Sequence, residues 1–444
     1  MQVIHQHKNI HVDTKGRDVI PYLRMFFLFL LSLLVFANFN GILGSLTGIN
    51  NLGSPLMLIC AVGLMLTTPL RRQDLGVVMG SFTLMIVLYW GIAWSSGLWY
   101  MEEGNFTLQD AKVGNRQLLT SLILVGTYYL IVIDALRSNK MDSLLYLFFI
   151  IFFVTLIAGI SEDYLGLRKV LYQGYKNSRA LGFFGNPNET GMQANLTFIL
   201  ACWLYMRGRM SNLFFVVVMG LSFYGAIVSF SRTAIILQVF VMMIFMGYLL
   251  ISGINRRGIR LYRRHWALLI SLVIGLYLSY FYFALPYYNS LDTGQRKRID
   301  AIGKLVVKQQ FDNKTTALRA GIFQDAIRLI RRRPLTGYGL HTFSKGGMFA
   351  TSREHGVHNM YLKIIGEAGI LPLLMYIMIV LLFLFGGGYI RGPEGIILTL
   401  FGVAIAINSF SSHGMYSQKF IISLWGVFLA VIHSRIQRTG MQYE

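Results

Sequence analysis

The chain has 444 residues, of which 55% are hydrophobic and only 13% are charged. A soluble globular domain would carry charge on about a quarter of its residues, so this composition excludes that class. Forty Lys and Arg against nineteen Asp and Glu give a formal net charge of +21. The basic residues are scattered thinly between apolar runs, which excludes a nucleic-acid-binding protein. The composition therefore indicates a helical membrane protein whose excess positive charge needs an explanation.

Twelve apolar segments follow one another along the chain, and each is close to the roughly 20 residues that a helix needs to cross a bilayer. The sequence therefore predicts an all-α integral membrane protein with about twelve transmembrane helices. Residues 1–21 are mostly polar and are expected to form a cytoplasmic tail rather than a cleaved signal. The predicted segments are 22–40, 53–70, 75–95, 118–137, 141–160, 189–207, 211–230, 233–253, 265–286, 369–389, 394–411 and 418–434.

Basic residues in the short loops orient these segments, because Lys and Arg are enriched on the cytoplasmic side. Alternate loops carry Arg or Lys, with five Arg between positions 256 and 264, whereas 41–52 carries none. This alternation places both termini in the cytoplasm, in agreement with an even number of spans. The predicted parts are a cytoplasmic tail (1–21), transmembrane helices 1–9 (22–286), a large outer loop (287–357), an amphipathic helix with transmembrane helices 10–12 (358–434) and a second cytoplasmic tail (435–444).

The large outer loop, 287–357, holds thirteen Lys and Arg against five Asp and Glu. Long loops cross the membrane largely regardless of their charge, so these basic residues are free to serve function. Apolar residues at helical spacing predict an amphipathic helix over 317–333, which Pro334 ends. A second short helix is expected to start near His358. The loop is therefore expected to be partly helical and to lie on the periplasmic or outer face.

Four candidate functional residues lie on this face. Arg179 precedes a Gly- and Asn-Pro-containing turn, and Arg232 lies in a turn of almost no length, where a charge at membrane depth usually faces a polar cavity. Arg319 lies early in the amphipathic helix. His358 is a titratable imidazole at a helix start, suited to a general base. The alternatives are headgroup anchoring or solvation for the Arg residues and a capping role for His358.

Several Arg on one face together with a His suit a phosphate-bearing substrate, because guanidinium binds phosphate oxygens bidentately and stays charged. The donor would be a lipid-linked diphosphate, and Arg would stabilise the charge that develops on the leaving diphosphate. His358 would take the proton of an acceptor hydroxyl. His355 and His358 have the spacing of two metal ligands on a helix, but no acidic ligand set accompanies them. We expect neither a metal site nor a cofactor.

The motifs around these residues resemble the bacterial O-antigen ligase and O-antigen polymerase superfamily over roughly residues 175–385. Two positions depart from the ligase pattern, since Ile236 stands in place of Leu and Pro372 in place of Gly, Thr or Tyr. The matching segments are Arg179 with Gly182 and Asn186-Pro187-Asn188, then Ser231-Arg232-Thr233-Ala234, then Arg319 with Pro334-Leu335-Thr336-Gly337-Tyr338-Gly339-Leu340-His341-Thr342-Phe343, and finally His358-Asn359-Met360-Tyr361-Leu362 with Glu367-Ala368-Gly369-Ile370.

The resemblance implies a GT-C-type glycosyltransferase of the bacterial inner membrane that uses undecaprenyl-diphosphate-linked glycans. Polymerisation of O-antigen, capsule or exopolysaccharide repeat units is the expected activity. Ligation to lipid A-core and transport or flipping of lipid-linked sugars are the alternatives. The expected partners are this donor, a glycan or lipid A-core acceptor, the lipid bilayer and a chain-length regulator, and no nucleic acid. The residues assigned to catalysis are His358, Arg319 and Arg232, and those assigned to substrate binding are Arg179, Asn186, Asn188, Tyr338 and Asn359.

Overall fold

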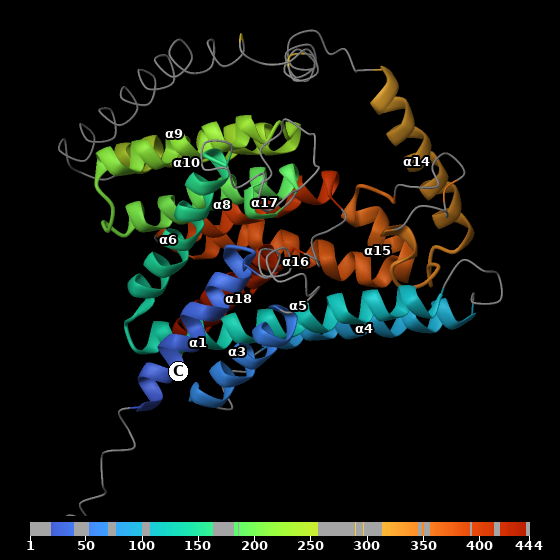
Figure 1. Cartoon of the computed structure of the whole chain (residues 1–444), viewed down its shortest axis with the longest axis horizontal. Coiled ribbons are helices and arrows are strands. Elements are labelled where there is room, and N and C mark those ends of the chain that lie inside the picture. Colours follow the sequence, from blue (N-terminus) through green and yellow to red (C-terminus); the bar gives the residue numbers. More distant parts are fainter. Residues whose placement is uncertain are drawn as a thin grey trace, which may run out of the picture.

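The part of the chain that the computed structural model describes is helical and contains no strand (Figure 1). Helices satisfy their own backbone hydrogen bonds, which a chain in hydrocarbon requires. The described residues are 19–39, 53–69, 77–99, 107–162, 182–184, 186–255, 289, 296, 313–344, 349, 356–390, 393–412 and 418–440. The helices are α1 (Val19–Phe36), α3 (Gly53–Thr67), α4 (Val77–Trp99), α5 (Leu108–Arg137), α6 (Met141–Ile160), α8 (Pro187–Met206), α9 (Asn212–Val228), α10 (Arg232–Asn255), α14 (Asn313–Arg332), α15 (Met360–Ala368), α16 (Ile370–Tyr389), α17 (Pro393–Ser411) and α18 (Lys419–Gly440).

Eleven of the twelve predicted apolar segments coincide with these helices, and segment 265–286 lies outside the described residues. Within the described part, seven helices are long and apolar enough to cross a membrane: α4, α5, α6, α10, α16, α17 and α18. Helices α1, α3 and α9 are apolar but shorter, and α8 belongs to neither set. The described part of the chain is therefore all-helical and contains several membrane-spanning candidates.

One predicted boundary is wrong. The segment predicted over 118–137 was expected to begin at residue 118, but α5 already begins at Leu108. Thr107 caps its first turn, since the Thr107 hydroxyl accepts the Asp110 N–H at 3.2 Å and the Asp110 carboxylate accepts the Thr107 N–H at 2.9 Å. This reciprocal cap stabilises a helix start whose polar residues do not look like a membrane segment.

Helix α8 is surrounded by α6, α9, α10 and α17, against which it packs (Figure 1). Its side chains are buried almost all round from Thr190 to Tyr205. Small residues let neighbouring backbones approach closely: a Cβ added at Gly426 of α18 would lie 2.4 Å from the Val125 carbonyl of α5. Aromatic stacking completes the core, with the rings of Trp203 and Phe428 5.4 Å apart.

Ion pairs join helix ends that the basic-loop pattern assigns to the cytoplasmic side. Arg207 pairs with Asp142 of α6 at 2.5 Å and with Glu394 of α17 at 2.7 Å. Arg209 pairs with Asp142 at 2.6 Å, and Arg435 of α18 pairs with Glu394 at 2.9 Å. Two acidic residues therefore hold three of the predicted loop and tail arginines in one network.

Candidate functional site

The start of α8 and the turn between α9 and α10 lie against each other. A Cβ atom added at Gly191 would lie 2.7 Å from Ser229 Oγ and 2.5 Å from the Ala234 Cβ, so the contact needs glycine. One turn further along α8, Asn195 Nδ2 donates to the Ala234 carbonyl at 3.2 Å. The Asn-Pro-Asn motif and the Arg232 turn, which are separated in sequence, are thereby brought together.

The turn that precedes Arg232 is shaped by its own serines. Ser229 Oγ donates to the Ala226 carbonyl at 2.7 Å and accepts the Ser231 N–H at 3.2 Å. Between them, Phe230 adopts a left-handed backbone conformation with φ +50°. Arg232 is half-buried and is the first residue of α10. Its guanidinium therefore belongs to a helix N-terminus, where charge and dipole both attract anions.

The N-terminus of α8 is capped by Asn186. Its side-chain oxygen accepts the Asn188 N–H at 3.0 Å, and its Nδ2 donates to Glu189 Oε1 at 3.4 Å. Asn186 is half-buried and Asn188 is exposed. Arg179, the remaining residue of this predicted group, lies outside the described residues.

The predicted amphipathic helix is confirmed as α14, which starts a turn earlier than expected. Its apolar face, with Ile322 and Ala326, packs against Tyr338, Phe343 and Val357. The Tyr338 hydroxyl donates to the α14 backbone at Leu329 O, 3.0 Å away. Tyr338 is thus buried, and its contacts hold α14 against the segment that follows it. Arg319 lies in α14, one turn before Ile322, and its side chain lies outside the described part.

His358 and Asn359 stand at the start of α15, as predicted. Asn359 is the N-cap: its side-chain oxygen accepts the Leu362 N–H at 3.0 Å. His358 is half-buried and directly precedes this cap. The neighbouring Val357 packs with α14 and donates its N–H to the Phe343 carbonyl at 2.9 Å. Arg319 and His358 are thereby carried by elements that share one small core.

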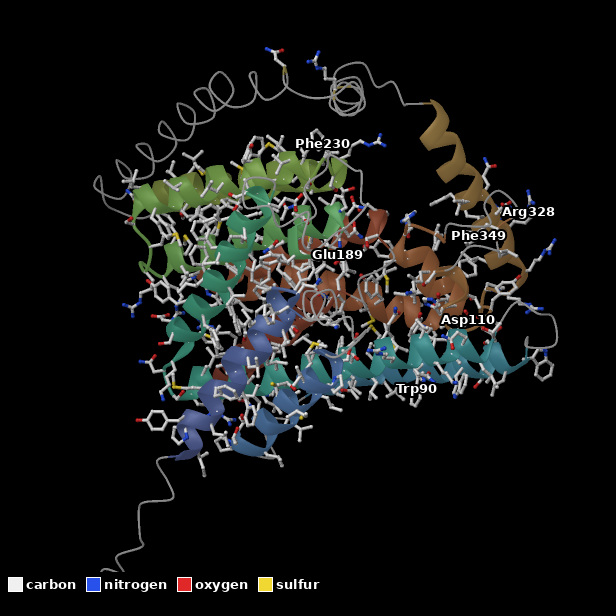
Figure 2. The ribbon with its side chains drawn as sticks, viewed as in Figure 1. Trp90, Asp110, Glu189, Phe230, Arg328 and Phe349 are labelled. Carbon is white, nitrogen blue, oxygen red and sulfur yellow. The ribbon has the colours of Figure 1, made fainter. Side chains whose placement is uncertain are left out.

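Helices α17 and α18 link the two halves of the site. Asn359 Nδ2 donates to Phe410 O in the last turn of α17 at 3.4 Å, and α17 also packs on α8 and α10. Gln418, at the start of α18, hydrogen-bonds Glu189 in the first turn of α8. Figure 2 labels Glu189 in the first turn of α8 and Phe230 in the turn between α9 and α10.

Two of the sequence motifs interlock through their backbones. The Tyr338 N–H donates to Gly366 O at 2.8 Å, and the Gly339 N–H donates to Glu367 O at 3.0 Å. A Cβ added at Gly337 would lie 2.4 Å from the Glu367 carbonyl carbon. The 334–343 motif and the 367–370 motif, with Gly366 directly before it, therefore meet as one structural unit that positions α15.

Buried charged residues around α15 escaped the sequence analysis. Lys363 and Glu367 are 4% and 0% exposed. Their spacing of four along a short helix was the available signal. Glu367 was quoted within a motif but given no role, and Glu189 directly follows the Asn186-Pro187-Asn188 motif. Among the described residues, no group of three or more His, Cys, Asp and Glu could hold a metal ion.

A comparison with protein-family models finds that residues 215–377 match a family described as O-antigen ligase. A comparison with curated proteins finds no match. The matched range runs from α9 into α16 and contains Arg232, Arg319 and His358, whereas Arg179 precedes it. The match confirms, over these residues, that the chain resembles the O-antigen ligase and O-antigen polymerase superfamily.

Proposed function

We propose that this protein is a membrane glycosyltransferase that moves a glycan from an undecaprenyl-diphosphate-linked donor to a sugar hydroxyl, and that it polymerises repeat units. The observation that carries the proposal is the meeting of the α8 and α10 N-termini at Gly191, with Arg232 at that point. Two positive helix ends and a guanidinium suit a diphosphate. Arg179 and Arg319 would complete its binding, and Asn186 and Asn188 would line the same end.

In this proposal His358 is the general base. The acceptor hydroxyl oxygen attacks the anomeric carbon of the donor sugar, and the bond from that carbon to the diphosphate oxygen breaks. The hydroxyl proton passes to His358, and the lipid diphosphate leaves with its charge stabilised by Arg232 and Arg319. Asn359 and Tyr338 would help to shape the acceptor side.

The proposed topology has twelve spans, both termini in the cytoplasm and the site on the outer face of a bacterial inner membrane. The ion pairs of Arg207, Arg209 and Arg435 support it, because these residues come from loops and a tail assigned to one side. Helix α8 begins at the end opposite to the loop that carries Arg207 and Arg209. Helix α10 begins directly after α9, at the end of α9 opposite to the same loop. In this topology both helix starts therefore lie on the outer side. The outer loop 287–357 would then supply Arg319 and lead to His358.

Ligation to lipid A-core is the second candidate, because the matching family is described as O-antigen ligase. Both activities share the donor, the arginines and the base. They differ only in the hydroxyl that attacks. Ile236 and Pro372, which depart from the ligase pattern, favour the polymerase.

The two candidates are separated by the acceptor in a purified, reconstituted transfer assay. The protein is supplied with lipid-linked repeat units, with or without lipid A-core. A polymerase lengthens the lipid-linked glycan in the absence of lipid A-core, and a chain-length regulator added to the assay should then narrow the product lengths. Transfer only onto lipid A-core would contradict the polymerase and support the ligase. No transfer under either condition would contradict both.

A further inference from the structure

A small cavity lies where α15 packs against α4, with α5 beside it. Its volume is about 10 Å³, about the space of one water molecule. Five polar side chains from four parts of the chain line it: Tyr89 of α4, Gln117 of α5, His341, and Lys363 and Glu367 of α15. Figure 1 shows α15 between α14 and the α4–α5 pair. A concentration of buried polar groups costs free energy unless their hydrogen bonds are satisfied, so such a cluster has a definite geometry.

Glu367 is the hub of this cluster. Its carboxylate accepts hydrogen bonds from the Tyr89 hydroxyl and from Ser344 Oγ, the latter at 3.2 Å. Its backbone carbonyl accepts the Gly339 N–H at 3.0 Å. Glu367, which is fully buried, therefore joins α15 by hydrogen bonds both to α4 and to the 339–344 segment.

Lys363 lies one turn before Glu367 on α15 and lines the same cavity. Burial lowers the pKa of its ammonium group, and the negative charge of Glu367 opposes that shift. The Lys363 N–H donates to the Asn359 carbonyl at 3.0 Å, which closes the first turn of the helix beside His358. Lys363 thus connects the cavity to the first turn of α15, which directly follows His358.

We infer that Glu367 is a positioning residue, which holds α15 against α4 and so sets His358 relative to the donor. The inference rests on the proposed function for the role of His358. Glu367 lies nine positions after His358, and about 12 Å along the helix from the N-cap Asn359 at a rise of 1.5 Å per residue. Glu367 therefore acts through the placement of α15 and not by contact with the reacting groups. Small misplacements matter because transfer requires the base within hydrogen-bond reach of the acceptor hydroxyl.

The test compares Glu367→Gln and Tyr89→Phe with Tyr146→Phe. Tyr146 is the control, because its hydroxyl donates to the backbone carbonyl of Arg209 at the predicted cytoplasmic end, away from the cavity. Glu367→Gln keeps the size of the side chain and removes its charge. We expect it to lower kcat about tenfold while the donor Kd stays within about twofold. Tyr89→Phe should lower kcat less, and the double variant should be no slower than Glu367→Gln alone.

Hydrogen exchange of residues 360–368 gives a readout that does not depend on activity. Glu367→Gln and Tyr89→Phe should raise exchange in this helix, and Tyr146→Phe should leave it unchanged. Unchanged exchange in the first two variants would overturn the inference whether or not transfer is observed. Loss of donor affinity equal to the loss of kcat would overturn it as well, because Glu367 would then serve donor binding. Absence of transfer in the unaltered protein contradicts the proposed function alone.

Discussion

At the scale of single residues, the arrangement around Arg232 explains how a charge is held where a membrane helix begins. Ser229 and Ser231 shape the turn before it, and Gly191 lets the start of α8 approach. A guanidinium that is already oriented loses less freedom on binding a phosphate group. The backbone conformation before Arg232 therefore determines where this side chain starts.

Replacing Arg232 tests the proposed diphosphate contact. Arg232→Ala should weaken donor binding about tenfold or more, because hydrogen bonds to charged groups contribute about 1.5–3 kcal/mol. Arg232→Lys should recover part of the affinity, since it keeps the charge and loses the bidentate geometry. Binding of a lipid-linked diphosphate by the purified variants measures both effects. An unchanged donor affinity in Arg232→Ala would assign Arg232 a structural role.

The sequence identified the residues whose motifs or loop position made them conspicuous. His358 and Asn359 stand at the start of α15, and Arg232 follows a tight turn, as predicted. The role of Glu367 could not be recognised, because its partner Tyr89 lies 278 positions away on another helix. Contacts at such a separation are a product of the fold and leave no local pattern.

At the scale of elements, the junction between α15 and α16 depends on one glycine. Gly369 has φ +81°, and a Cβ there would lie 1.9 Å from the Leu335 carbonyl oxygen. The Ile370 N–H donates to Pro334 O at 2.9 Å across the same contact. The end of α15 is thereby locked onto the segment that follows α14.

Gly369→Ala should therefore loosen α15 and lower stability. Strain at a positive φ costs about 1–3 kcal/mol, and the steric clash adds to it. Gly388→Ala is the matched control in α16, because nothing lies within 4 Å of its added Cβ. Thermal unfolding of the two variants in the same detergent measures the difference. Equal unfolding temperatures would show that the junction tolerates a side chain.

Helix existence was predictable and one helix start was not. Apolar runs and helical spacing located α6, α10 and α14 within a few residues. The start of α5 was missed because Lys112 and Arg116 lower the hydropathy of its first turns. The Thr107–Asp110 spacing is a capping signal that hydropathy ignores.

At the scale of the whole molecule, the charge of +21 has two origins. Part of it lies in the predicted cytoplasmic loops, where Asp142 and Glu394 gather three arginines. Part lies in the outer loop, where thirteen basic residues exceed five acidic ones. In the proposed topology, the basic residues of the outer loop face the side on which the anionic substrate binds.

Single cysteines test that topology. Both native cysteines are buried, so the background reaction with a membrane-impermeant maleimide should be low. Gln324→Cys, on the exposed face of α14, should react in spheroplasts, in which the outer membrane is removed and the inner membrane is intact. Ser138→Cys, exposed between α5 and α6, should react only after the inner membrane is opened. The reverse pattern would place the candidate site in the cytoplasm.

The most direct test of the central claim is the rate of glycan transfer by reconstituted His358→Ala protein. A general base contributes about 100- to 10,000-fold, so transfer should fall at least about 100-fold while donor binding is kept. His355→Ala, three residues earlier, is the control and should retain transfer, whereas an equal loss in both variants would indicate a metal pair. Transfer by His358→Ala at the rate of the unaltered protein would contradict the account.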